Sequence, residues 1–457
     1  MVSLPGRRKS RREFLRNATL VAASAAMQGT APCIAHAQPA PDYRLEISEI
    51  DWDLSPKKKI RTAAYNGQIP SPLLRLTEGK PVSIAITNKL DHPEIVHWHG
   101  QWIPSAADGS MEEGSPMIPA GGSTLVEFVP KPAGLHWYHT HATANRNLKH
   151  GLYTGQFGIL NVAPSANSAL YDQEQFIVLH DWEPYYSASG DGSLMVNYAL
   201  GSVNGRMLGH GNPIRVREGE RVLFQILNAS ATEVHWLALP GHRFQVLALD
   251  GAPVATQAIV ETLRLGPAER VTTLVQMNAP GVWVLGEPRK DFLDAGIGIV
   301  VEYAGRTGVP QLPHETRLLW NYRVFADATP MLRKPDLTIP LIFTSKFKGH
   351  GGLDQWMING KSYPDYEPVI LHAGLRHRLV FDNRSTDDHP VHLHRHNFEL
   401  VSMQGDPLSG VHKDVVVVAA GTRIEADLVA NNPGSTLFHC HQQDHMDSGF
   451  MTLFRYA

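Results

Sequence analysis

Apolar and polar residues alternate along several short stretches of the chain, and three of these stretches resemble one another. Residues 82–88, 222–228 and 378–383 place apolar side chains at every second position and end in Asn. A period of two predicts strands with one buried face. Each stretch follows an Asn-Gly turn, at Asn66, Asn204 or Asn359. With 39 Gly, 32 Pro and no sustained helical period, the sequence predicts an all-β protein.

The same pattern recurs with a long period, which separates this chain from proteins built of short repeats. A Gly at positions 134, 281 and 434 opens the last strand of each copy, so the copies are offset by 147 and 153 residues. Copies of this size with short strands and frequent turns predict antiparallel β-sandwiches or barrels of Greek-key type. We therefore expect three domains, at 38–163, 164–310 and 311–457.

The first 37 residues predict an export signal. They carry six basic residues and one acidic residue, a twin-arginine stretch at 10–16, a mild apolar run at 18–31 and an Ala-x-Ala cleavage pattern at 35–37. A membrane anchor is the alternative, but it needs about 20 strongly apolar residues, and polar residues interrupt this Ala-rich run. The pattern predicts passage through the Tat machinery to the periplasm or the cell exterior, often with a cofactor already bound. We expect no membrane span in the mature protein.

Charge and cysteine content narrow the function further. Without the signal, the chain has 35 basic and 43 acidic residues, and this net charge of −8 argues against a nucleic-acid partner. Of the two cysteines, Cys33 lies in the signal, so the mature protein is expected to keep Cys440 alone and to form no internal disulfide. A lone thiol in an oxidising compartment needs burial or a bound partner. Histidines flank Cys440 on both sides, which indicates a metal.

Histidines gather in four short motifs, two in the first copy and two in the third. In a strand, residues i and i+2 project from the same face about 6.5–7 Å apart, so each His-x-His pair can offer two imidazoles to neighbouring metal ions. The middle copy serves as a control, because Leu237 stands where the second histidine of a pair would be. We therefore expect metals between the first and third domains. The motif residues are His97, His99, His139, His141, His389, His392, His394, His439, His441 and His445.

Cys440 divides these histidines into two groups, because it points to the opposite face of its strand from His439 and His441. On the cysteine face, His389 and His445 complete a His2Cys set, which is typical of blue copper. On the other face the remaining eight imidazoles converge, which is too many for one ion and suits three. Zinc is the main alternative, but structural zinc prefers four closed ligands in compact spacings. We expect copper.

The four motifs resemble those of three-domain multicopper oxidases, the family of laccases, copper efflux oxidases and bilirubin oxidases. They are His-x-His-Gly at 97–100, His-x-His at 139–141, His-Pro-x-His-x-His at 389–394 and His-Cys-His-x3-His at 439–445. The resemblance covers essentially the whole mature chain and implies three cupredoxin domains and four copper ions. It implies type 1 copper at His389, Cys440 and His445, and type 2 copper at His97 and His392. The type 3 pair would use two sets, His99, His139 and His441 on one ion and His141, His394 and His439 on the other.

The resemblance also implies a route for electrons and protons. A small reducing substrate gives one electron at a time to the type 1 site, the electron crosses from Cys440 to His439 and His441, and dioxygen is reduced to water at the other three coppers. Asp108 stands where the family keeps an acid near the type 2 copper, which could relay protons; a loop aspartate before a Gly turn is the alternative. In several bacterial relatives a glutamate follows the last type 1 histidine, but here that residue is Met446, and Asp444 does not align with it.

The position beside the type 1 copper distinguishes members of the family. Bacterial relatives commonly have Met ten residues after the cysteine, whereas this chain has Phe450, with Met451 next to it. Phe cannot coordinate a metal, and loss of the thioether should raise the copper potential, a pattern that resembles fungal laccases. A one-residue shift that brings Met451 to the copper is the alternative, and strand alternation argues against it.

These features predict a laccase-like oxidase of phenols and aryl amines. A periplasmic Cu(I) oxidase for copper tolerance is the second hypothesis, although copper efflux oxidases carry a methionine-dense segment and 313–365 here holds only Met331 and Met357. A cell-division scaffold that has lost its copper ligands, or a two-domain copper nitrite reductase, fits less well because the ligand set is complete. A monomer is the default expectation.

Overall fold

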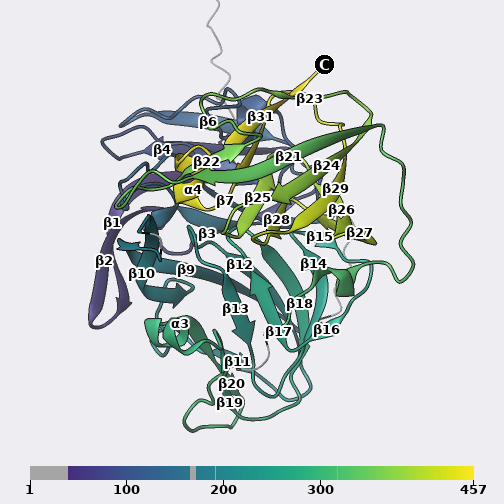
Figure 1. Ribbon diagram of the computed structural model, residues 1–457. Helices are drawn as coiled ribbons and strands as arrows, with labels where there is room; N and C mark the ends of the chain where they lie inside the picture. Colours follow the sequence, from purple (N-terminus) through teal and green to yellow (C-terminus); the bar gives the residue numbers. More distant parts are fainter. Residues whose placement is uncertain (1–39, 165–170, 191, 316–317) are drawn as a thin grey trace, which may run out of the picture. The chain divides into compact units, whose positions relative to one another are not determined.

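The computed structural model describes residues 40–164, 171–190, 192–315 and 318–457. The predicted signal at 1–37, including Cys33, lies outside the described residues. Within them the chain forms six sheets, which Figure 1 shows in sequence colours. The sheets come in three pairs, each made from one continuous part of the chain.

The first pair uses residues 43–163 and contains the first two histidine motifs. One sheet has the order β2-β1-β4-β6 and the other β3-β8-β7-β5. Helix α2, Ser105–Asp108, and the 3-10 turn η1, Gly151–Tyr153, lie in its connections. The strands are β1 Tyr43–Ser55, β2 Lys58–Tyr65, β3 Ser71–Thr77, β4 Val82–Asn88, β5 Val96–His99, β6 Ser123–Phe128, β7 Gly134–Thr140 and β8 Phe157–Ala163.

The second pair uses residues 173–303 and includes helix α3, Lys290–Ala295. One sheet follows the order β10-β9-β12-β18-β14-β15, with β16 against β14, and the other β11-β20-β19-β13-β17. The strands are β9 Gln173–Ala188, β10 Leu194–Val203, β11 Ile214–Val216, β12 Arg221–Asn228, β13 His235–Ala238, β14 Phe244–Leu249, β15 Ala252–Pro253, β16 Ile259–Val260, β17 Thr262–Leu265, β18 Arg270–Gln276, β19 Val282–Gly286 and β20 Gly298–Tyr303.

The third pair uses residues 337–456, preceded by the 3-10 turn η2, Tyr322–Phe325, and includes helix α4, Gln443–Asp447. Its sheets have the orders β22-β21-β24-β29-β26-β27 and β23-β31-β30-β25-β28. The strands are β21 Leu337–Lys346, β22 Gln355–Ile358, β23 Val369–Leu371, β24 Arg376–Asn383, β25 His389–Leu393, β26 Phe398–Met403, β27 Asp406–Lys413, β28 Val415–Val418, β29 Arg423–Val429, β30 Thr436–Cys440 and β31 Met451–Tyr456.

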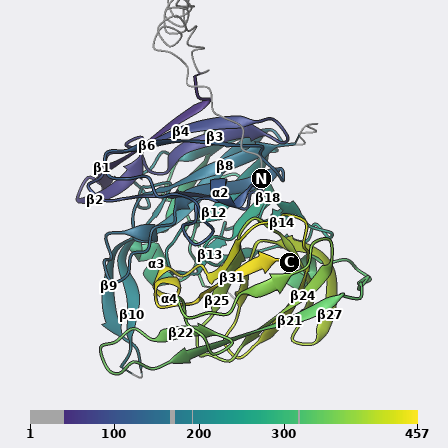
Figure 2. The same cartoon turned by 90° about the horizontal axis from the view of Figure 1, so that it is seen from above.

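The three pairs repeat one topology, as the sequence repeat predicted. In each, the opening strand runs antiparallel to the next strand and parallel to a later one, which gives β1 with β2 and β4, β9 with β10 and β12, and β21 with β22 and β24. In Figure 1 the second pair, in teal, lies below the first and third pairs, and Figure 2 shows the first and third pairs side by side from above. The prediction of an all-β protein is confirmed.

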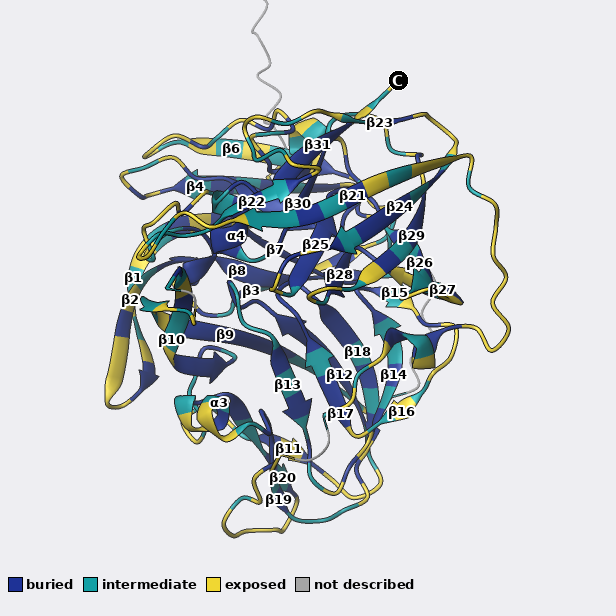
Figure 3. Ribbon diagram, viewed as in Figure 1, coloured by how far each residue is buried: buried dark blue, intermediate teal, exposed yellow. Residues whose placement is uncertain are grey.

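The strands that carry the histidine motifs are among the most deeply buried. Every residue of β5, β25 and β30 is buried, and β25 is dark along its whole length in Figure 3. The strand register places the motifs opposite each other. His97 pairs with His139 across β5 and β7, and His392 pairs with His439 across β25 and β30. Side chains directly opposite in antiparallel strands lie about 5 Å apart at Cβ, so register alone assembles two halves of a donor set.

A search of the described residues for helices able to cross a bilayer found none that are both long and apolar enough.

Candidate metal centres

Eight buried imidazoles from the first and third sheet pairs meet in one place, and we name them the eight-imidazole cluster. Two stacked contacts join the pairs, His97 on His394 with ring centroids 3.9 Å apart and His99 on His392 at 3.8 Å. The Nε2 atoms of His394 and His439 approach to 3.1 Å. The structure thus brings together the eight histidines that the sequence predicted to converge. The cluster is His97, His99, His139, His141, His392, His394, His439 and His441.

Backbone acceptors fix the orientation of several rings in this cluster. His97, His139, His392 and His439 each place Nδ1 2.8 Å from a carbonyl oxygen, of Asp108, Thr140, Asp414 and Cys440 respectively. A carbonyl only accepts, so each Nδ1 carries the proton and each Nε2 keeps its lone pair for the cluster. His99 is reversed, since its Nε2 faces the Asp414 carboxylate at 3.3 Å and its Nδ1 turns inward.

Several buried nitrogens of the cluster lack protein partners among the described residues. These are Nε2 of His97, His139, His141 and His392, Nδ1 of His99, and both nitrogens of His441. Burial, followed by the charges of neighbouring histidines, lowers the pKa of His99, His139 and His392 well below the usual range. Buried polar atoms are almost always satisfied, so this many unpartnered nitrogens in one place fit bound metal ions.

Within the cluster, donor atoms fall into sets close enough to share an ion. Donor atoms lie within 4.8 Å of one another in the set of His97, His392 and His394, in the set of His97, His99 and His139, and in the set of His141, His394 and His439. The last set is one of the two triplets that the family resemblance implies for the type 3 ions. Several residues belong to more than one set, as expected where neighbouring ions are close together.

Cys440 of β30 meets His389 from β25 and His445 from α4 in a second donor set, which we name the His2Cys site. The Cys440 sulfur lies 3.7 Å from each Nδ1, and the two Nδ1 atoms are 3.2 Å apart. The centre of this triangle is about 2.1 Å from every donor, the length of a metal–imidazole bond. Burial raises the pKa of the Cys440 thiol well above its usual range and lowers that of His445 to about 3. A bound cation would supply the charge that deprotonates the thiol.

Phe450 and Met451 occupy different surroundings. Phe450 is fully buried in the same core cluster as Cys440, and its ring centroid lies 4.7 Å from that of His389. Met451 belongs to a separate small core with Leu437 and Met446. The thioether of Met451 is therefore packed away from the cysteine face, and the ring of Phe450 faces the site instead.

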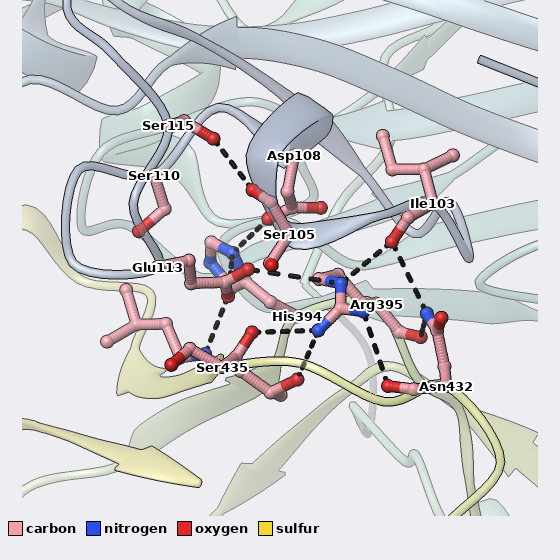
Figure 4. Close-up of polar contacts among 12 residues, drawn as sticks. Ile103, Ser105, Asp108, Ser110, Glu113, Ser115, His394, Arg395, Asn432 and Ser435 are labelled. Atoms are coloured by element: carbon pink, nitrogen blue, oxygen red, sulfur yellow. Dashed lines mark hydrogen bonds and ion pairs between the residues drawn. The ribbon is translucent and has the colours of Figure 1, made fainter. Parts of the chain in front are cut away.

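Two buried carboxylates stand beside the cluster, Asp108 at the end of α2 and Glu113 in the loop that follows (Figure 4). Asp108 Oδ2 accepts a hydrogen bond from His394 Nδ1 at 2.7 Å and lies 3.2 Å from His97 Nδ1. Its other oxygen has no hydrogen-bond partner among the described residues. Glu113 lies 3.2 Å from the same His394 nitrogen and accepts from the Leu437 backbone N–H at 2.6 Å. Burial and the nearby Asp108 raise the pKa of Glu113 well above its usual range.

Sequence reasoning identified Asp108 but missed Glu113 and Asp414. Glu113 sits in a polar loop at 109–115, where an acid is ordinary, so only its burial distinguishes it. Asp414 left a clearer signal, because Lys413 and Asp414 directly precede Val415–Val418, a strand buried at every position. A charged pair beside a wholly apolar strand indicates buried ion pairing.

Asp444 accepts a hydrogen bond from the His445 backbone N–H at 3.0 Å, and burial raises the pKa of Asp444 to about 6.

The middle sheets hold a different arrangement at the corresponding strand. His235, on β13, places Nε2 2.8 Å from Asp181 and Nδ1 3.5 Å from Glu287. Burial opposes protonation, but the charges and hydrogen bonds of these two carboxylates raise the pKa of His235 to about 10. Leu237 is fully buried in the apolar core. We name His235, Asp181 and Glu287 the middle-sheet cluster; its imidazole is protonated at neutral pH and has no lone pair to offer.

Comparison with known proteins gives one consistent result. Family models described as multicopper oxidase match residues 46–167, 136–288 and 336–457. Multicopper oxidase MmcO of Mycobacterium tuberculosis is 30% identical over 438 residues, which covers 87% of this chain and 83% of the relative. A laccase of Pycnoporus cinnabarinus is 26% identical over 446 residues, with 84% of each chain covered.

Solved structures show the same fold. Fet3p, a multicopper oxidase that functions in iron import, superposes with a TM-score of 0.77 at 18% identity, over 91% of this chain and 90% of that chain. A laccase from Botrytis aclada gives a TM-score of 0.76 at 20% identity, over 90% and 87%. The cupredoxin-like architecture predicted for the three sheet pairs is confirmed by these likenesses.

Proposed function

Because this chain belongs to the multicopper oxidase family and is a copper-dependent oxidoreductase, we propose that it is a laccase-type enzyme acting on phenols and aryl amines. Each substrate molecule would lose one electron, and four such oxidations would reduce one dioxygen to two waters. One observation carries the proposal. Cys440, at the end of β30, belongs to the His2Cys site, and its neighbours His439 and His441 belong to the eight-imidazole cluster, so the backbone of Cys440 joins its sulfur to both imidazoles.

The proposed copper ligands are those the sequence suggested. We assign the type 1 ion to the His2Cys site and the type 2 ion to His97 and His392. We assign the type 3 pair to the remaining six residues of the eight-imidazole cluster, as His99, His139 and His441 with His141, His394 and His439. The unpartnered nitrogens of the cluster support this assignment, because buried imidazole nitrogens without a protein partner are suitable copper ligands. Bound copper would supply one-electron redox chemistry and store the electrons until four are available.

The protein surrounds the His2Cys site unevenly, and this directs where a substrate can approach. His389 is completely buried, and its Nε2 lies 2.8 Å from the Ser385 hydroxyl. The His445 side chain is 10% exposed. Trp356 packs over His445 with ring centroids 4.1 Å apart and shields the imidazole face from water. We propose that the reducing substrate contacts the outer edge of His445, which is the shortest route from solvent to the sulfur of Cys440.

Phe450 closes the remaining side of that site. Its ring is fully buried against His389 and offers no donor atom. A three-donor site without a thioether favours the reduced ion and a high potential. A high potential suits phenols, which are harder to oxidise than Cu(I), and this supports the laccase-type reading over copper detoxification.

Protons for water formation must reach the buried cluster, and we propose Asp108 as the relay. Its Oδ2 accepts the Nδ1 proton of His394, while Oδ1 has no hydrogen-bond partner among the described residues. A carboxylate in this position can accept a proton on Oδ1 and pass it on while Oδ2 keeps the imidazole oriented. Glu113 lies beside the same imidazole and would be the next acid along such a path.

The test is dioxygen uptake by the copper-loaded protein with a phenol and, separately, with Cu(I) at matched concentrations. We expect uptake with the phenol to exceed uptake with Cu(I), four phenols consumed per dioxygen and no hydrogen peroxide. Cys440→Ser is the matched control; it should keep copper in the cluster and lose both the blue absorption and the uptake. Faster uptake with Cu(I) would identify a metallo-oxidase, and absence of a blue band would contradict both assignments.

Three further points belong to this proposal. We propose that residues 1–37 are a twin-arginine signal that sends the folded protein to the periplasm or outside the cell, and that the mature protein works as a monomer. We also propose domain boundaries near 163 and 310. Strands at 43–163, 173–303 and 337–456 support these boundaries because, among the described residues, no sheet mixes strands from two of these ranges.

A further inference from the structure

A group of fully buried charges lies where the three sheet pairs meet, next to the eight-imidazole cluster. Arg270 and Asp250 come from the middle pair, Lys413 and Asp414 from the third, and none is more than 1% exposed. With Glu269, which is 2% exposed, they form what we name the interface network. The middle sheets contribute no residue to either proposed copper site, yet they supply most of this network.

Arg270 binds Asp414 through two parallel hydrogen bonds. Its Nη1 donates to Oδ1 and its Nη2 to Oδ2, both at 2.6 Å. This fork-to-carboxylate pairing fixes the plane of the carboxylate as well as its position. Arginine stays protonated even when buried, so the arrangement does not depend on an uptake of protons.

Asp414 in turn touches two imidazoles of the cluster. Its Oδ1 lies 3.3 Å from Nε2 of His99, and its backbone oxygen accepts from Nδ1 of His392 at 2.8 Å. These two rings come from different sheet pairs and stack at 3.8 Å with an interplanar angle of 12°. This one residue therefore sets the tautomer of both members of a stacked pair, and its carboxylate beside Nε2 explains why His99 turns Nδ1 inward.

Arg270 itself cannot move easily, because its remaining N–H groups are used by backbone oxygens. Nε donates to Leu135 in the first pair at 3.2 Å, and the Nη atoms also reach the oxygens of Ala268 and Asp250 at 3.1 Å. Gly100 shows how closely the groups fit, since a Cβ at that position would lie 2.7 Å from Asp414 Oδ2 and 2.9 Å from Arg270 Nη2. With His136 Nδ1 at 2.5 Å and a backbone φ of +83°, the position at the end of the His-x-His-Gly motif has room only for glycine.

We propose that Arg270 is a positioning residue for the eight-imidazole cluster: acting through Asp414, the middle sheets hold His99 and His392 in the orientation that binds copper. The inference rests on the proposed copper assignment of those two histidines. Lys413 belongs to the same network but serves another purpose, because its Nζ pairs with Asp250 at 2.8 Å and Glu269 at 3.0 Å and not with Asp414. It offers a matched control, a buried cation one residue from Asp414.

The experiment compares Arg270→Met, Arg270→Lys and Lys413→Met in the copper-loaded protein. Copper affinity of the cluster is measured by chelator competition, with the type 2 paramagnetic resonance signal and the type 3 absorption as readouts. The blue band of the His2Cys site reports correct folding in each variant. Loss of an outer-sphere partner of a metal ligand weakens metal binding by about 10–100-fold. We expect that loss for Arg270→Met, a smaller loss for Arg270→Lys, and near wild-type cluster affinity for Lys413→Met.

The outcomes separate three cases. Wild-type cluster affinity in both Arg270 variants would overturn the inference. An equal loss of affinity in Lys413→Met would also overturn it, because any buried charge of the interface network would then stabilise the cluster to the same extent. If Arg270→Met yields no blue protein, the cluster affinity of Arg270→Lys is compared with that of Lys413→Met instead, and wild-type affinity in Arg270→Lys would overturn the inference. A wild-type protein that binds no type 2 or type 3 copper would contradict the proposed function instead.

Discussion

The same imidazole occupies matching strands in two regions of this molecule and has opposite properties. In the first sheet pair, His97 on β5 is surrounded by other imidazoles, and its Nε2 has no partner within the described chain. In the second pair, His235 on β13 has a carboxylate facing each nitrogen. Both side chains are fully buried. Burial alone therefore does not decide whether a histidine binds a metal; its partners decide.

Each region satisfies its buried imidazole with a different cation. Carboxylates from Asp181 and Glu287 hold a proton on His235, and the pKa of about 10 shows how firmly. Neighbouring imidazoles offer no such negative charge, and the backbone carbonyl at Nδ1 of His97 leaves the lone pair of its Nε2 for a metal ion. In the middle sheets a proton satisfies the buried imidazole, and in the first and third sheet pairs copper is proposed to do so.

The largest effect is expected when β5 receives the residue that β13 has at the matching position. His99→Leu places leucine where Leu237 stands in β13 and removes a proposed type 3 ligand. We expect oxidase turnover to fall by more than the about 10–100-fold that a change outside the ligand set costs. Steady-state dioxygen uptake measures this, and the blue band should persist. Turnover within a factor of two of wild type would show that His99 binds no catalytic metal.

Removing the middle imidazole should cost stability and leave the chemistry intact. His235→Leu leaves Asp181 and Glu287 buried without their shared cation, and breaking a buried ion pair in this way costs about 3–5 kcal/mol. Urea unfolding measures the loss. Copper content per folded chain should match wild type. Loss of copper in this variant would mean that the middle-sheet cluster and the eight-imidazole cluster are not independent.

The pH dependence of stability should show the proton on His235 directly. Its pKa is about 10 in the folded chain and about 6.5 unfolded. The contribution to stability is therefore complete below pH 6.5 and is lost as the pH rises toward 10, by at most about 1.4 kcal/mol per pH unit. Urea unfolding at pH 7, 8 and 9, compared between wild type and His235→Leu, isolates the effect. Equal slopes for the two proteins would refute a protonated His235.

The smallest effect is expected at the His2Cys site, where Phe450→Met adds a thioether. A weak axial sulfur stabilises the oxidised ion, so the type 1 potential should fall. About 59 mV corresponds to a tenfold change in a one-electron equilibrium, and we expect a decrease of that order. Redox titration of the blue band measures it. Met451→Leu is the control and should leave the potential unchanged, because Met451 packs in a different core.

Strand periodicity made the donor sets predictable. Ligands on one strand face must be spaced by two, and this rule placed His439 and His441 opposite Cys440 without knowledge of the fold. The repeat also indicated which copy lacks metal ligands, because Leu237 is visible in the sequence. Domain boundaries near 163 and 310 stay a prediction.

The surroundings of the ligands were not predictable in the same way. Asp414 contacts His99 across 315 residues of sequence, and no local pattern reports a pairing at that distance. The tautomer of each imidazole depends on a carbonyl oxygen, such as that of Thr140, which every residue possesses. Partners of this kind follow from packing of the sheet pairs and not from residue type.

The location of the ligands along the chain also has a consequence for biosynthesis. His97 and His139 are made early, but every proposed copper set needs at least one histidine from the segment that begins at His389, and the His2Cys site needs His445. A ribosome must therefore translate the chain to His392 before the first set is complete, and to His445 before all four are. Chains that stall before His392 carry no complete set, so a full complement of copper reports that synthesis passed His445.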